Sequence, residues 1–191
     1  MGNVDGVVQS DVKVMERPTR VRVRPYDEML RFLGLALTLA ATVIVGVDKE
    51  THTIPLIAGM QFRATAKWEY MSAFVYHLVS NAIACSYAAV SLVVSAKGRS
   101  RRGNRIPSLV LLLTTVDLVI MALLFSANGA AAAVGVIGKN GNSHVQWMKV
   151  CDVFDAYCRH MTTAIVLSLL GSTVFLLLVL LSIFKLHSKS T

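Results

Sequence analysis

Long apolar stretches alternate with shorter polar ones along the 191 residues of this chain. Four stretches are almost wholly apolar: residues 29–47, 70–96, 106–138 and 161–184. A helix needs about 20 mostly apolar residues to cross the hydrocarbon of a bilayer. Because lipid offers no hydrogen bonds to a backbone, each crossing segment must satisfy its own amides as a helix. The pattern therefore predicts an all-α membrane protein, a bundle of four transmembrane helices.

The polar segments fit around this bundle as tails and links. Residues 1–28 are polar, carry both signs of charge and contain two prolines, which predicts a disordered tail. Residues 185–191 form a short tail at the other end of the chain. The links 48–69 and 139–160 are too short for domains of their own, so the chain is one membrane domain.

The charges indicate how the bundle is oriented. Hydrophobic residues make up 54% and charged residues only 16% of the chain, against about 25% charged residues in soluble domains. Of the nineteen Lys and Arg residues, thirteen lie in residues 1–31, 97–105 and 185–189. This clustering beside the spans argues against nucleic-acid binding, and the positive-inside rule places both termini in the cytosol. The basic tail is either a solvated segment or, with the 97–105 link, a patch for anionic membrane lipids.

A cleaved signal peptide is the alternative interpretation of the first apolar stretch. The 28 residues before it are long for the charged region of such a peptide, and acidic residues dilute their positive charge. We therefore expect this stretch to remain as the first of the four helices.

Asp117 is the most informative single residue, because it lies inside the third apolar stretch. A charged side chain at the bilayer centre costs at least about 2.5–3.5 kcal/mol, so it should face the bundle interior and have a partner. Arg31, near the start of the first stretch, is the basic residue that fits this role. Arg31 lies about 5 Å and Asp117 about 16 Å into their stretches at 1.5 Å per residue. The two depths match if the embedded part of the third helix begins nearer Leu112.

Two hypotheses follow for this pair of residues. The structural one is a pin that fixes the first helix against the third through a bidentate ion pair. The functional one is an ion or proton pathway, in which His77 and Asn81 are further polar groups. These two residues are four apart in the second helix and share a face. They are better explained as hydrogen-bond donors and acceptors between helices.

Cys151 and Cys158 lie seven positions apart in the second outer link. If that link faces an oxidising compartment, the spacing permits a structural disulfide, and free thiols are the alternative. The pattern matches neither a redox Cys-x-x-Cys nor a zinc site. The third cysteine, Cys85, is expected to be a small packing residue within the second helix.

Small residues line two helix faces. One set lies in the second helix and the other in the outer half of the third. Small faces let helices approach closely in lipid, either within one bundle or between protomers, and the sequence leaves both open. The two sets are Ser80, Ala84 and Ala88, and Ser126, Gly129, Ala130 and Ala133.

Enzyme signatures are missing from the sequence. It has no Gly-rich phosphate loop, no His-Glu-x-x-His and no nucleophile elbow. We therefore expect no catalytic residue, no cofactor and no metal site.

Several motifs together resemble the plant Casparian strip membrane domain protein family, in its CASP-like branch. The resemblance covers most of residues 29–184. It rests on Arg31, 47–51, Tyr76, 80–87, Asp117, 126–133, 138–142, Trp147 and 151–158. The link 48–69 lacks the Phe-rich signature of the founding members, which is why the CASP-like branch is the match.

The resemblance implies four helices with cytosolic termini, a paired Arg31 and Asp117, and residence in the plasma membrane. It also implies a non-enzymatic scaffold that forms homodimers or higher oligomers, and hetero-oligomers with related family members. Membrane lipids and cell-wall-modifying proteins are the partners it implies. A small transporter or channel that uses Asp117, His77 and Asn81 along a polar track is the alternative function.

Overall fold

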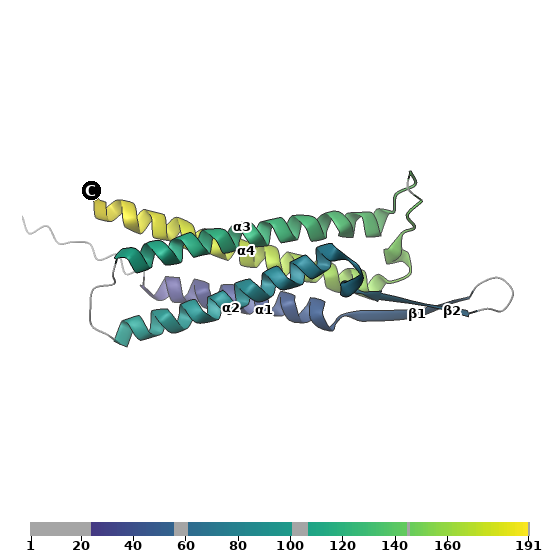
Figure 1. Ribbon diagram of the computed structural model, residues 1–191, viewed down its shortest axis with the longest axis horizontal. Helices are drawn as coiled ribbons and strands as arrows, with labels where there is room; N and C mark the ends of the chain where they lie inside the picture. Colours follow the sequence, from purple (N-terminus) through teal and green to yellow (C-terminus); the bar gives the residue numbers. More distant parts are fainter. Residues whose placement is uncertain (1–23, 56–60, 101–106, 145, 191) are drawn as a thin grey trace, which may run out of the picture.

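Four long helices lie side by side as an elongated bundle (Figure 1). A computed structural model describes residues 24–55, 61–100, 107–144 and 146–190 of the chain. α1 and α3 each pack against both α2 and α4. Chain direction alternates from each helix to the next, so α1 begins at the end of the bundle where α4 finishes (Figure 1). The helices are α1 (Arg24–Val47), α2 (Ser72–Ser100), α3 (Pro107–Asn140) and α4 (Asp155–Ser190).

All four helices are long and apolar enough to span a membrane. Much of their apolar surface points outward, and Leu111 and Val119, for example, are each 59% exposed. Contiguous apolar surface of this extent is rare on soluble proteins, and lipid is the solvent that suits it. The predicted fold class, a four-helix membrane bundle, is confirmed.

α1 begins earlier than the sequence indicated. Residues 24–28 were predicted to belong to a disordered tail, but they form its first turns. Pro25 does not oppose this, because a proline in the first turn lacks only an N–H that the helix leaves unbonded anyway. Asp27 also lies one turn before Arg31, with 3.7 Å between its carboxylate and Arg31 Nε. Residues 1–23, and with them most of the predicted lipid patch, lie outside the described residues.

α4 is longer than predicted at both ends. It begins at Asp155 rather than at residue 161, because its polar first turns still bury Tyr157 and Met161 at helical spacing. It continues to Ser190 rather than ending at residue 184, so the predicted tail is helical up to that residue. Lys and Leu, which occur in this segment, are favourable helix formers where a helix leaves the membrane.

The first link is a β-ribbon, which the sequence analysis did not predict. Strands β1 (Lys49–Pro55) and β2 (Gln61–Lys67) pair antiparallel, with Lys49 opposite Lys67 and Thr53 opposite Arg63. Figure 1 shows the ribbon projecting from the bundle roughly along its long axis. We call this end the ribbon end, and the end with the start of α1 the terminal end. A short 3-10 helix, η1 (Trp68–Tyr70), leads from the ribbon into α2.

The second link also lies at the ribbon end (Figure 1). α3 stops where Gly141 adopts φ +67° and donates its N–H to Ile137 O at 2.8 Å. This left-handed residue is the usual glycine stop of a helix. A Cβ at Gly141 would lie 2.8 Å from Trp147 O, so the position excludes larger residues. A second 3-10 helix, η2 (Val150–Asp152), then leads into α4.

The core contains two apolar clusters with polar groups between and beyond them. The outer cluster, at the ribbon end, holds seven buried residues. The inner cluster, nearer the terminal end, holds six. The outer members are Val45, Phe74, Ala131, Phe154, Tyr157, Met161 and Ala164, and the inner members are Ala84, Ala88, Ile120, Leu124, Phe175 and Leu178.

Candidate functional site

Arg31 and Asp117 form a bidentate ion pair between α1 and α3. Arg31 Nη2 lies 2.8 Å from Asp117 Oδ2, and Nη1 lies 3.2 Å from Oδ1. The two residues are only 3% and 0% exposed. Because α1 begins at Arg24, Arg31 lies about 10 Å along its helix, and Asp117 lies about 15 Å along α3. The depth mismatch that the sequence indicated is therefore small enough for the arginine side chain to bridge.

Tyr87 of α2 is a third member of this site, which the sequence analysis missed. Its hydroxyl donates to Asp117 Oδ1 at 2.7 Å and also lies 3.2 Å from Leu113 O. A signal was present, since Tyr87 follows Ala84 by three positions and so lies on the same helix side as that small residue. The site therefore joins α1, α2 and α3.

The charge of this site comes from a buried arginine and two acids, Asp27 and Asp117. Taking an ion pair out of water costs free energy that good geometry and added hydrogen bonds must offset. For Asp117, the bidentate contact supplies the good geometry and the tyrosine hydroxyl supplies an added hydrogen bond. Removing one partner would leave an uncompensated charge in the core. The arrangement suits a fixed tie between helices.

A second polar group of residues lies between the two apolar clusters. His77 Nε2 lies 3.1 Å from Asn128 Oδ1, and Asn128 Nδ2 donates to Ser172 Oγ at 3.1 Å. This chain of contacts joins α2, α3 and α4. Asn128 and Ser172 were not among the predicted site residues, because their burial depends on how α3 and α4 are rotated.

Asn81 differs from His77 in what it contacts. Its Nδ2 donates to His77 O within α2 at 2.9 Å, and it also lies 3.4 Å from His77 Nε2. Both residues are buried, but among the described residues no hydrogen bond carries Asn81 to another helix. The structure thus brings His77 to α3 and keeps Asn81 within its own helix.

Cys151 and Cys158 are joined by a disulfide at the ribbon end of the bundle. The bond ties η2 to the first turn of α4. Cys85 of α2 is a free, half-buried thiol.

The two sets of small residues have different surroundings. Ser80, Ala84 and Ala88 of α2 are buried within the bundle. In α3, Ser126, Gly129 and Ala133 are exposed and Ala130 is half-buried. No described heavy atom lies within 4 Å of an ideal Cβ at Gly129. The first set serves packing inside one chain. The second set is mostly exposed, and the Tyr76 hydroxyl of α2 lies 3.4 Å from Ser126 Oγ at its edge.

Within the described part of the chain, no three His, Cys, Asp or Glu side chains are grouped as metal ligands would be. Within the ion-pair site, Arg31, Asp117 and Tyr87 contact one another and the backbone. Within the second polar group, the side chains likewise contact one another and the backbone. Their chemistry is that of hydrogen bonds and charge pairing between helices.

Comparison with known proteins gives the chain its family. Residues 20–174 match the Casparian strip membrane protein domain, whose description names no reaction. A CASP-like protein 1E1 from Vitis vinifera is 54% identical over 99% of this chain and 96% of its own length. CASP-like protein 1E2 from Vitis vinifera is 48% identical over 96% of this chain and 95% of its own length.

More distant relatives also span most of the chain. CASP-like protein 1E2 from Arabidopsis thaliana is 44% identical over 82% of this chain and 84% of its own length. No solved structure matches the chain. The chain is a multi-pass membrane protein that belongs to the Casparian strip membrane protein domain family.

Proposed function

We propose that this chain is a non-enzymatic scaffold of the plasma membrane that self-associates and organises a membrane domain around itself. The observation that carries the proposal is the outward small-residue face of α3, formed by Ser126, Gly129, Ala130 and Ala133. Three of these four residues are exposed, whereas the small residues of α2 are already packed inside the bundle.

Small side chains matter here because lipid supplies no hydrophobic driving force between helices. Association in a bilayer depends on close van der Waals packing, which small residues permit. An ideal Cβ at Gly129 meets open space, so a helix of a second copy has room to approach the α3 backbone. The seam would join homodimers or higher oligomers, and hetero-oligomers with related family members.

The core of one chain supports scaffolding more than transport. A transport track needs polar groups in sequence through the membrane. His77 and Asn128 lie between the outer and inner apolar clusters, and the inner cluster separates them from Asp117. The polar residues also bond to one another, as expected of ties that fix the four helices.

In the proposed orientation both termini face the cytosol, as the clustering of basic residues indicates. The β-ribbon and the disulfide-linked segment then lie outside the cell. They form the surface that partners would meet, and proteins that modify the cell wall are the class we propose for them.

The seam is tested by co-purifying two differently tagged copies from one membrane. We expect Gly129→Leu and Ala133→Leu to reduce co-purification while each chain still folds. Gly135→Leu is the matched control, because Gly135 has equally open space around its Cβ. At 100° per residue it lies on the opposite side of α3 from the small-residue face. Equal loss of co-purification in all three variants, or no loss in any of them, would refute the seam.

The transporter alternative predicts a different result in liposomes. Ion or solute flux that Asp117→Asn abolishes, with folding retained, would replace the scaffold proposal.

Orientation is tested by labelling single cysteines placed in the 97–105 link and in the second outer link. Reaction of both from the same side of the membrane would refute the proposed topology. Fluorescence of a tagged chain in plant cells tests the plasma-membrane location.

A further inference from the structure

The β-ribbon has two different faces. In an antiparallel pair, side chains alternate between the two sides of the sheet. One side carries basic and hydroxyl residues, with Lys49 opposite Lys67, Thr51 opposite Thr65 and Thr53 opposite Arg63. We call these six residues the basic face.

The other side of the ribbon is turned toward the bundle. Ala64 and Ala66 pack against the outer apolar cluster, and Glu50 Oε2 accepts a hydrogen bond from the Tyr157 N–H at 2.7 Å. The basic face therefore points away from the bundle. Four of its members are exposed and two are half-buried. The exposed ones are Lys49, Thr51, Thr53 and Arg63, and the half-buried ones are Thr65 and Lys67.

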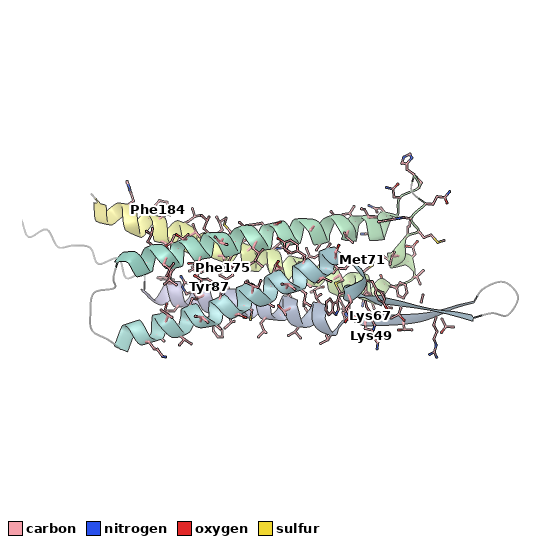
Figure 2. The ribbon with its side chains drawn as sticks, in the orientation of Figure 1. Lys49, Lys67, Met71, Tyr87, Phe175 and Phe184 are labelled. Atoms are coloured by element: carbon pink, nitrogen blue, oxygen red, sulfur yellow. A yellow bond between two sulfur atoms is a disulfide. The ribbon has the colours of Figure 1, made fainter. Side chains whose placement is uncertain are left out.

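The positive charge of this face is not compensated within the described structure. Figure 2 shows Lys49 and Lys67 next to each other at the foot of the ribbon, where the strand register pairs them directly. Like charges directly opposite in a sheet are destabilising. The acids nearest in sequence to Lys49 are engaged elsewhere, since Asp48 contacts His160 and Glu50 contacts Tyr157. Among the described residues, no ion pair joins a carboxylate to Lys49, Arg63 or Lys67.

We propose that the basic face binds an acidic polysaccharide, an extended polymer whose sugars carry both carboxylates and hydroxyls. One carboxylate would lie between Lys49 and Lys67 and relieve their repulsion. Arg63 lies about 13 Å further along the ribbon, at 3.3 Å per residue, and would pair with a second carboxylate. Thr51 and Thr65 lie between these two positions, and their hydroxyl oxygens are 3.2 Å apart. Because a hydroxyl can donate one hydrogen bond and accept two, this pair can still exchange hydrogen bonds with sugar hydroxyls.

Two other anionic partners fit this face less well. An anionic lipid surface would reach the lysines at the foot, but the ribbon projects along the bundle axis, so Arg63 lies far from the headgroups (Figure 1). An acidic peptide would match the charges and make less use of the threonine hydroxyls. The proposal rests on the outward orientation of the ribbon given above, and it is independent of self-association.

The test uses the full chain in nanodiscs of zwitterionic lipid, with binding measured by biolayer interferometry. The probe is a polygalacturonate oligomer, and its fully methyl-esterified form is the ligand control. We expect saturable binding of the acidic oligomer only, which weakens as salt rises because exposed charges are screened. Equal binding of the esterified oligomer would overturn the proposal. So would preferential binding to anionic lipid vesicles or to polyglutamate.

Two variants locate the site. Removing all three charges with Lys49→Gln, Arg63→Gln and Lys67→Gln should weaken binding about tenfold or more. The matched control removes three exposed basic residues of the same bundle end with Lys139→Gln, Lys149→Gln and Arg159→Gln, and should bind as the parent does. Equal weakening in both triple variants would overturn the proposal.

Lys67→Glu separates binding from folding. It places an acid opposite Lys49, so the ribbon amides should exchange hydrogen more slowly. Binding of the acidic oligomer should nevertheless fall. Unchanged binding in this variant would also overturn the proposal, whatever the result for the Gly129 variants. A failure here therefore leaves the scaffold proposal standing, and the reverse also holds.

Discussion

The hydroxyl of Tyr87 donates a hydrogen bond of 2.7 Å to the same Asp117 oxygen that Arg31 Nη1 approaches at 3.2 Å. One carboxylate oxygen thus holds α1 and α2 against α3 at a single point in the core. Further toward the ribbon end, His77, Asn128 and Ser172 join α2, α3 and α4. The two sets of contacts together connect all four helices.

Tyr87→Phe tests the third contact to Asp117. The change removes only the hydroxyl, and Asp117 keeps both contacts to Arg31. We expect the free energy of unfolding to fall by about 1–2 kcal/mol, measured by SDS titration in mixed micelles. Tyr76→Phe is the control, because the Tyr76 hydroxyl makes only an exposed contact of 3.4 Å to Ser126. Equal losses in the two variants would contradict the assigned role of Tyr87.

A double-mutant cycle tests whether Arg31 and Asp117 act as one unit. Arg31→Met leaves Asp117 buried without its cation, and Asp117→Leu leaves Arg31 with the 3.7 Å contact to Asp27. Breaking a buried pair in this way costs about 3–5 kcal/mol of unfolding free energy. The double variant removes both charges, so it should be more stable than either single variant. In the double variant the Tyr87 hydroxyl would still have a hydrogen-bond acceptor, because it also reaches Leu113 O. Additive losses in the double variant would show that the two residues contribute independently.

The sequence was sufficient to identify the spans and the ion pair. Each span is a long apolar stretch, and Arg31 and Asp117 stand out because a charge inside such a stretch requires a partner. Tyr87 gives no comparable signal, because tyrosines often lie at membrane surfaces. Whether it reaches Asp117 depends on the rotation of α2 about its own axis. Packing among all four helices fixes that rotation.

The β-ribbon and the start of α4 were missed for a related reason. Like charges face each other at Lys49 and Lys67, so local pairing preferences argue against a ribbon. Its foot is held by contacts with α4, which lies far along the chain. Glu50 and Tyr157, for example, are 107 positions apart. Contacts between residues so far apart in the chain cannot be predicted from a short window of sequence.

Gly171→Leu tests the close approach of α1 and α4. An ideal Cβ at Gly171 would lie 3.2 Å from Thr38 Cγ2 and 3.6 Å from Leu37 Cβ. A leucine there must push α1 outward, and overpacking of this kind costs about 1–3 kcal/mol. Gly135→Leu is the control, because no described heavy atom lies within 4 Å of its Cβ. Thermal unfolding in detergent should show the loss at Gly171 alone, and equal stability of the two variants would contradict the close approach.

Alkylation tests the disulfide between Cys151 and Cys158. The chain has three cysteines, so the denatured, non-reduced protein should expose one thiol, that of Cys85, and three after reduction. Cys151→Ser with Cys158→Ser should lower the free energy of unfolding by about 2–3 kcal/mol through the lost loop constraint. Cys85→Ala serves as the control variant. Three thiols without reduction would exclude the bond.

Glu50→Ala tests how the ribbon is held on the bundle. The first N–H groups of a helix have no partner within it, and Glu50 Oε2 accepts one of them, from Tyr157 at 2.7 Å. The negative charge also lies near the positive end of the α4 dipole. Loss of a comparable helix cap costs about 1 kcal/mol. We therefore expect faster hydrogen exchange in β1, β2 and the first turn of α4, measured by mass spectrometry.

Two further variants separate the hydrogen bond from the charge. Glu50→Gln keeps an acceptor oxygen and should retain most of the protection. Glu69→Ala removes the same charge from an exposed position in η1 and should leave exchange unchanged. Because a two-stranded ribbon is marginally stable by itself, its order should depend on this contact more than on pairing between its strands. If Glu50→Ala left exchange unchanged, the ribbon would have to be held instead by the contact of Asp48 with His160 and by Ala64 and Ala66 against the outer cluster.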